Sequence, residues 1–204
     1  NPHGDQTFTQ GVQNSCNVVF VNLGRRIGAE RMYKDIKAFG FGEKTGIDLT
    51  GEQSGIIPAN PQSIKEVNLA TISYGQGIAV TPIQLITAIS SIANGGDLMK
   101  PRLVKELLDD NGNVVNSFEP VVKRKVISKE TSQTLLGILE SVVSNGTGNK
   151  AYVPGYRIAG KTGTAQKVID GKYAPGKYIS SFAAVAPAND PKVAVLVIVD
   201  EPSN

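Results

Sequence analysis

The 204-residue sequence has a single cysteine, Cys16, so it contains no internal disulfide framework. It has no apolar run long enough to cross a membrane, and Asn1-Pro2-His3 is not the start of a signal peptide. It also lacks a basic stripe, because its 21 Lys and Arg residues are interspersed with 18 Asp and Glu residues. Binding to phosphate backbones needs such a stripe, so nucleic acid is not expected as a partner.

Apolar residues make up 40% of the chain, which is enough to bury a core and to form one domain or part of one. Residues 42–63 are rich in glycine and proline and predict a long surface loop. Helical periodicity and capping signals predict four helices. The first covers residues 7–23 and has a break near 14–17, and the others cover 29–39, Thr81 to the glycines at 95–96, and 128–144.

Extended segments dominate the end of the chain. A turn signal at 110–113 predicts a hairpin between residues 103–108 and 114–118. Short, turn-rich connections then predict one antiparallel sheet from the runs 156–168, 178–186 and 192–199. The predicted fold class is α+β, an antiparallel sheet with helices packed on its faces.

The letters Lys-Thr-Gly occur twice, at 44–46 and at 161–163. The first copy lies in the glycine-rich loop and is interpreted as a turn without a catalytic part. The second copy overlaps residues 155–162, which match the phosphate-binding pattern G-x-x-x-x-G-K-T in every position. That motif needs a strand before the first glycine and a helix from the Lys-Thr pair, and the sequence favours neither, so nucleotide binding is the less favoured alternative.

The second copy falls instead within a predicted strand, where a substrate can lie alongside as an added strand. Gly163 leaves room for it, and Lys161 with the threonine hydroxyls attracts a carboxylate. Ser15 and Asn17 form a Ser-x-Asn pair, in which a hydroxyl that moves protons and an amide that holds a carbonyl face one cleft. Each of these residues also has an interpretation without function. Lys161 can be a solvated strand residue, Gly163 can lie at a bulge, and the Ser15 and Asn17 pair can simply break a helix.

Four segments, in this order and spacing, resemble the transpeptidase domain of the class B penicillin-binding proteins of the elongation, division and sporulation group. They are VQNSCNVVFVNLGRRIG, FGFGEKTGIDLTGE, ISYGQGIAVTPIQLITAISSIANGG and IAGKTGTAQK. The resemblance implies a five-stranded antiparallel sheet with helices on both sides, shared with serine β-lactamases. Residues 1–204 are then the C-terminal part of one such domain.

The activity that the resemblance implies is acyl transfer from D-Ala-D-Ala stem peptides of peptidoglycan through a serine ester, and β-lactams trap that serine. Its motifs are Ser-x-x-Lys, Ser-x-Asn and Lys-Thr-Gly. Ser15 would relay a proton and Asn17 would hold the substrate amide. Lys161, Thr162 and Gly163 match the third motif, and Thr164 would bind the terminal carboxylate and lend its N–H to the oxyanion hole.

No serine in the sequence is followed three residues later by lysine, and Thr147 to Lys150 is the nearest string. The resemblance places the acylated serine before residue 1 and a further helix after residue 204, so this polypeptide by itself is expected to be inactive. It also implies a position on the outer face of the bacterial cytoplasmic membrane through an N-terminal anchor that these residues lack. The implied partners are stem peptides, β-lactams and membrane proteins of cell-wall synthesis.

No cofactor is expected. The alternative is a zinc ion near His3, Asp5 and Cys16, because some members that resemble this group bind zinc there, although a surface histidine and a small buried thiol explain these residues as well. Two other functions share the sheet and the Lys-Thr-Gly strand. A β-lactamase would need a deacylating base, which the sequence does not identify, and a penicillin-sensing domain would bind the drug without turnover.

Overall fold

The computed structural model describes residues 3–169 and 171–202. In these residues the helices are α1 (Phe8–Gln13), α2 (Asn17–Ile27), α3 (Ala29–Ala38), α4 (Glu66–Ser73), α5 (Pro82–Ala93) and α6 (Lys129–Asn145), with short 3-10 turns η1 (Pro61–Ser63) and η2 (Asn149–Ala151). The strands are β1 (Asp97–Met99), β2 (Glu106–Leu108), β3 (Val114–Ser117), β4 (Val122–Lys125), β5 (Ala159–Ile169), β6 (Lys172–Ala186) and β7 (Val193–Asp200).

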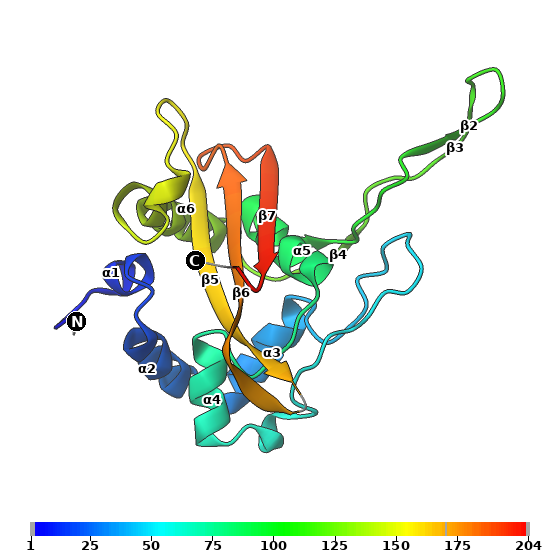
Figure 1. Cartoon of the computed structure of the whole chain (residues 1–204). Helices are drawn as coiled ribbons and strands as arrows, with labels where there is room; N and C mark the ends of the chain where they lie inside the picture. Colours follow the sequence, from blue (N-terminus) through cyan, green and yellow to red (C-terminus); the bar gives the residue numbers. More distant parts are fainter. Residues whose placement is uncertain (1–2, 170, 203–204) are drawn as a thin grey trace.

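The central sheet has the order β5-β6-β7 and is antiparallel throughout, as predicted (Figure 1). β5 lies at its edge, so one side of this strand has no sheet partner in the described part of the chain. The connection at 169–177 is predicted as a turn, but its residues 172–177 belong to β6. This prediction was wrong because Tyr173 pairs with Val168 and Gln166 donates a hydrogen bond to the Ala174 carbonyl, which extends the hairpin.

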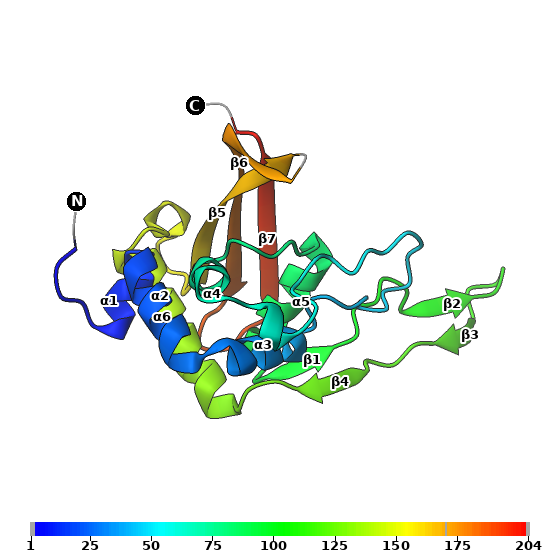
Figure 2. The same cartoon turned by 90° about the horizontal axis from the view of Figure 1, so that it is seen from below.

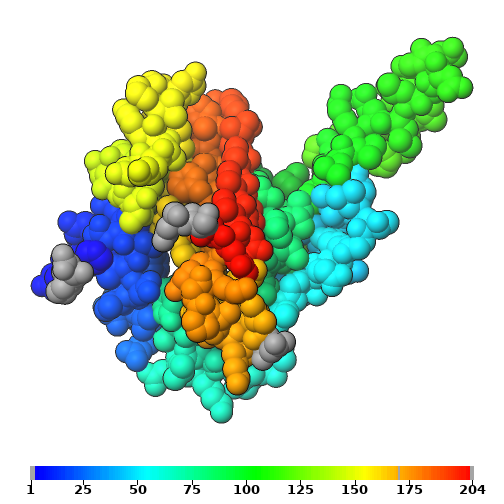
Figure 3. All heavy atoms as spheres, in the orientation of Figure 1, coloured from blue at the N-terminus to red at the C-terminus, as the bar shows by residue number. Residues whose placement is uncertain are grey.

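Helices α5 and α6 pack on one face of this sheet. The core between them contains Leu136, Ala159, Val185 and Ala188, together with Ile89 and Ile92 of α5. The other face carries Val193, Val195, Val197 and Val199, which are 46–56% exposed. Figure 3 shows β7 uncovered on the side that faces the viewer. Of the five strands that the resemblance implies, the described residues supply three to this sheet.

Helices α3 and α4 form a second core of Ile36, Ile64, Leu69 and Ile72, against which Ile57 of the 42–63 loop also packs. Gly24 lets α2 approach α4 closely, because a Cβ atom there would lie 1.8 Å from Ser73 Oγ. Helix α4 was not predicted. Its apolar residues lie around the whole helix instead of on one face, so no helical period is visible in the sequence.

Most predicted helix ends are confirmed, but the end predicted at residue 23 was wrong, because α2 continues to Ile27. The break near residues 14–17 separates α1 from α2, and α3 ends before the glycines at 40 and 42. Thr81 and Gln84 form a capping box at the start of α5, with proline at its first position. Ser128 caps α6 through the Thr131 N–H.

A narrow arm extends from the body in the views of Figures 1 and 2. It consists of the predicted hairpin β2–β3, carried on β1 and β4, which pair with each other and were not predicted. Both of these strands are only three or four residues long, too short for an alternating pattern to be visible.

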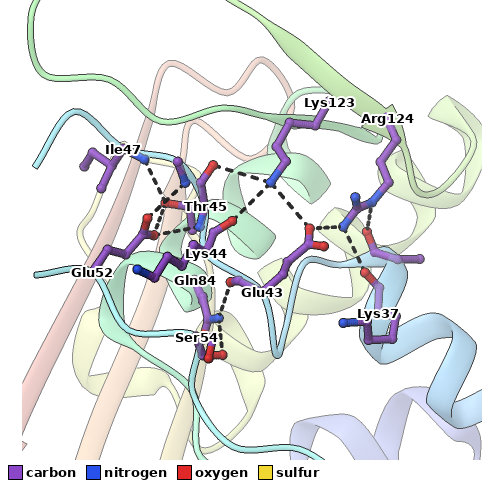
Figure 4. A network of polar contacts seen from close by, with 12 residues as sticks. Lys37, Glu43, Lys44, Thr45, Ile47, Glu52, Ser54, Gln84, Lys123 and Arg124 are labelled. Carbon is purple, nitrogen blue, oxygen red and sulfur yellow. Dashed lines mark hydrogen bonds and ion pairs between the residues drawn. The ribbon is translucent and has the colours of Figure 1, made fainter. Parts of the chain in front are cut away.

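The predicted loop 42–63 is held to the body by the polar network in Figure 4. Arg124 of β4 donates to Glu43 at 2.6 Å and to the Lys37 and Ala38 carbonyls, and Gln84 donates to the Glu43 and Ser54 carbonyls at 2.7 and 2.8 Å. Thr45 of the first Lys-Thr-Gly copy is buried and bonds to Glu52. The contacts of this first copy hold the loop in place, so its role in the fold is structural.

Replacing Glu43 with glutamine is expected to lower the free energy of unfolding by about 1–2 kcal/mol, since it weakens a charge-assisted, partly exposed pair. Partial burial raises the pKa of Glu43, but the hydrogen bonds and charges of Arg124 and Lys123 outweigh it, so the pKa is lowered overall. A carboxyl group with a lowered pKa stabilises the fold above its unfolded-state pKa, and this contribution is lost as pH falls through the folded-state value.

Urea unfolding of the 204-residue chain at pH 7 and at pH 3 would measure this effect. The difference between the wild type and the Glu43→Gln variant should shrink at the lower pH. Glu119→Gln, an exposed position on the arm, is the matched control and should have no effect at either pH. A difference that stays constant with pH would contradict the assignment to the carboxylate.

Candidate active site

The second Lys-Thr-Gly copy lies near the start of β5, with Lys161 and Gly163 on one face of the strand and Thr162 and Thr164 on the other. The Lys161 ammonium donates a hydrogen bond of 2.8 Å to Ser15 Oγ and one of 3.1 Å to the Thr162 carbonyl. Burial lowers the pKa of Lys161. The structure thus brings together two predicted site residues that are 146 positions apart in the sequence.

Ser15 occupies the turn between α1 and α2 in a left-handed conformation, with φ of 50°. This conformation is unfavourable for a residue other than glycine and is typical of functional sites. The turn is fixed by hydrogen bonds from the Ser15 N–H to the Val12 carbonyl and from the Cys16 N–H to the Gly11 carbonyl. Asn17 is the first residue of α2 and is exposed.

Gly163 is needed for packing within the sheet. A Cβ atom at this position would lie 2.6 Å from Ser181 Oγ on the neighbouring strand β6. Its lack of a side chain therefore serves the contact between β5 and β6, in addition to the predicted room for a substrate. Thr164 is exposed, and β5 is an edge strand, so a peptide can pair with the free side of the strand.

Thr147, which follows α6, also lies at this site, although no motif in the sequence indicates it. Its hydroxyl lies 3.4 Å from the Thr162 hydroxyl, and its N–H donates to the Gln13 carbonyl at 3.0 Å. In the sequence, Asn145-Gly146 indicates only the end of the helix predicted over 128–144. The sequence feature that could have indicated Thr147 is its place between the end of a helix and the strand that carries Lys-Thr-Gly.

The predicted zinc ligands are only partly together. Two hydrogen bonds are the main causes that lower the pKa of the Cys16 thiol to about 7. The larger effect comes from the Val19 N–H and the smaller one from the His3 side chain. Asp5 is exposed. Within residues 3–169 and 171–202, no three His, Cys, Asp or Glu side chains form a group that could hold a metal ion. Zinc binding remains a prediction.

The phosphate-binding pattern at residues 155–162 does not form a phosphate loop. Gly155 lies in a turn, and the Lys161-Thr162 pair continues into β5, where a helix N-terminus would be required. The interpretation of residues 155–162 as a phosphate loop is therefore wrong. No helix among the described residues is long and apolar enough to span a membrane.

An antiparallel sheet whose edge strand sets Lys-Thr-Gly against Ser-x-Asn places the chain in the class of penicillin-recognising proteins. More particularly, the chain belongs to the family of the penicillin binding protein transpeptidase domain, which matches residues 1–204. It is 52% identical over 202 residues to stage V sporulation protein D of Bacillus subtilis, covering 98% of this chain and 31% of that protein. Peptidoglycan D,D-transpeptidase FtsI of Escherichia coli is 34% identical, with 98% and 32% covered.

Solved structures agree with this assignment. Penicillin binding protein 3 of Mycobacterium tuberculosis, complexed with ampicillin, matches with a TM-score of 0.86 and 33% identity over 95% of this chain and 44% of that chain. The transpeptidase domain of Burkholderia pseudomallei penicillin-binding protein 3 matches with a TM-score of 0.87 and 32% identity over 99% and 58%. The predicted fold class is confirmed. The chain spans about a third of the length of the curated relatives named above.

Proposed function

We propose that residues 1–204 are the C-terminal part of one transpeptidase domain of a peptidoglycan D,D-transpeptidase. The observation that carries the proposal is the hydrogen bond from Lys161 to Ser15 at the free edge of β5. It joins two of the three motifs of the family at a place where a peptide can pair with the strand. The names of the relatives support the same activity.

The reaction is an acyl transfer in two steps. A serine attacks the carbonyl between the two terminal D-alanines, an ester forms, and the terminal D-alanine leaves with a proton on its amine. The amine of a second stem peptide then attacks the ester, a new amide forms, and the serine recovers its proton. Because the Lys161 ammonium donates to Ser15 Oγ, the Ser15 proton is free to pass to the leaving amine.

The remaining residues orient the substrate. Asn17 holds the stem-peptide amide, and Thr164 binds the terminal carboxylate and contributes its N–H to the oxyanion hole. The ammonium of Lys161 attracts the same carboxylate. A β-lactam presents a carboxylate and a reactive carbonyl in a similar way. The complex of the Mycobacterium tuberculosis protein with ampicillin supports β-lactam binding by this chain.

The serine that attacks is proposed to lie in a segment outside these 204 residues, since the sequence contains no Ser-x-x-Lys. The proposed location is the outer face of the bacterial cytoplasmic membrane, with anchorage by another part of the protein and with membrane proteins of cell-wall synthesis as partners. The relatives are about three times longer than this chain, and the name of one of them, peptidoglycan D,D-transpeptidase, supports a role in cell-wall synthesis.

Intact mass after incubation with benzylpenicillin tests the proposal. We expect a mass increase equal to one penicillin on the intact protein and no increase on residues 1–204 alone, with circular dichroism to show that both are folded. An adduct on the 204-residue chain would show that the nucleophile lies within it. A folded intact protein without an adduct would contradict the transpeptidase assignment.

A further inference from the structure

The side chain of Lys167, in β5, reaches across the sheet to the end of β7. Its ammonium donates to a carboxylate oxygen of Asp200 at 2.9 Å and to one of Glu201 at 2.8 Å. Lys167 is the least exposed of the three side chains, at 23%. Because β6 lies between β5 and β7, this contact joins the two outer strands of the sheet. We call these three residues the Lys167 clamp.

The clamp lies where the pairing of β5 with β6 is irregular. The residues before and after Lys167 pair with Tyr178 and Tyr173, so four residues of β6, 174–177, lie opposite Lys167 alone. One of the four is Pro175, which has no N–H to donate. The regular ladder of backbone hydrogen bonds is therefore interrupted at Lys167, and the clamp supplies side-chain contacts in its place.

Glu201 is held in position by its own backbone. Its N–H donates to the Tyr178 carbonyl at 2.9 Å. Its φ of 49° is left-handed, which is unfavourable for a residue other than glycine and persists where the surrounding contacts require it. Hydrogen bonds with Glu201 and then with Asp200 raise the pKa of Lys167, so its ammonium stays charged at neutral pH. The clamp is thus a small network of charge-assisted hydrogen bonds, which is stronger than an isolated surface ion pair.

The clamp adjoins the part of β5 on which the substrate is proposed to lie. Thr164, which is proposed to bind the terminal carboxylate, precedes Lys167 by about 10 Å of strand. The start of the strand is occupied, because Lys161 contacts Ser15 of the turn between α1 and α2. The free edge that is left for the rest of the stem peptide is therefore the segment from Thr164 to Lys167.

We propose that Lys167 is a positioning residue, which holds the edge of β5 through the clamp so that the stem peptide can pair with it. The inference rests on the proposed function and adds to it a residue that touches neither the reacting carbonyl nor the terminal carboxylate. An extended peptide binds a sheet edge through successive backbone hydrogen bonds, which need a strand of fixed shape. Substrates that reach past Thr164 therefore depend on the clamp, and short ligands do not.

The test compares two thioester substrates on the intact protein. The long substrate carries a complete stem peptide before the scissile bond, and the short one carries a single acetylated D-alanine. Lys167→Met keeps an unbranched side chain and removes the charge. We expect kcat/KM for the long substrate to fall about fivefold or more, mainly through KM, as for the loss of one or two backbone hydrogen bonds. The short substrate and acylation by benzylpenicillin should change less than about twofold.

Three further variants separate the clamp from other causes. Lys167→Arg keeps a charged donor and should retain most of the activity toward the long substrate. Asp200→Ala combined with Glu201→Ala removes both acceptors and should cause a similar loss, with little further loss when Lys167→Met is added. Lys172→Met, at an exposed lysine of the same hairpin, is the matched control and should leave all values unchanged.

A loss of equal size for the long and the short substrate would show a merely structural role for Lys167 and overturn the inference. Full activity of Lys167→Met toward the long substrate would also overturn it, as would a loss that adds in full to that of the variant without the two carboxylates. A wild type that neither turns over the thioesters nor forms a penicillin adduct would overturn the proposed function, and this inference with it.

Discussion

Replacement of Lys161 with alanine is expected to slow acylation of the intact protein by benzylpenicillin by about a hundredfold or more. The variant loses the ammonium that donates to Ser15 Oγ at 2.8 Å and with it the positive charge beside the carboxylate site. Positioned proton transfer contributes about 10²–10⁴-fold to a rate, and the lost attraction adds to this effect. Rapid-quench measurement of the adduct by mass gives the rate.

The chain supplies a matched control in its other Lys-Thr-Gly copy. Lys44 is exposed in the loop 42–63, and Lys44→Ala should leave the acylation rate unchanged. Lys161→Arg keeps the charge but not the shape of the donor, and it should recover only part of the loss. If Lys44→Ala slows acylation as much as Lys161→Ala does, the assignment of the site to β5 is wrong.

Replacement of Gly146 with alanine is expected to lower the free energy of unfolding by about 1–3 kcal/mol, as overpacking does. The added Cβ atom would lie 2.7 Å from the Gln13 carbonyl oxygen and 2.9 Å from that of Val142, and both are backbone atoms. Relief of this contact moves the Thr147 loop away from the turn that holds Ser15. Acylation of the intact protein should therefore slow as well.

Gly137 is the control for this change, because it lies within α6, the helix that Gly146 follows, and a Cβ atom there meets no neighbouring group within 4 Å. Gly137→Ala should raise the free energy of unfolding by about 0.5–1 kcal/mol through helix propensity. Urea unfolding of the 204-residue chain measures both variants. A Gly146→Ala variant as stable as the wild type would show that the loop accommodates the methyl group and would remove the basis of the predicted loss of activity.

Much of the fold could be predicted because its signals are local. The capping box at Thr81 and the turn signals around β2–β3 and β6–β7 depend on residues that are close in the sequence. Helix α4 escaped prediction because its apolar residues are not gathered on one face, and β1 and β4 escaped because three or four residues are too few to show an alternating pattern.

The site was predictable in part for the same reason. Ser15, Asn17 and residues 161–164 carry short motifs, so the sequence alone indicates them. Their roles stay predictions, while the structure shows the contact between Lys161 and Ser15. Thr147 carries no motif, and its place beside Thr162 depends on where α6 ends relative to β5. That arrangement is a property of the packed helix and sheet.

The distance along the chain between Ser15 and Lys161 also determines when the site forms during folding. The contact spans 146 positions, and β5 acquires its sheet partner only when β6 has paired with it. Closing so long a loop costs entropy that must be offset by contacts already formed, so long-range pairings are late events. The helices α1 and α2 can form early, but the nascent chain cannot bring Lys161 on its paired strand to Ser15 until residues near 186 have been synthesised.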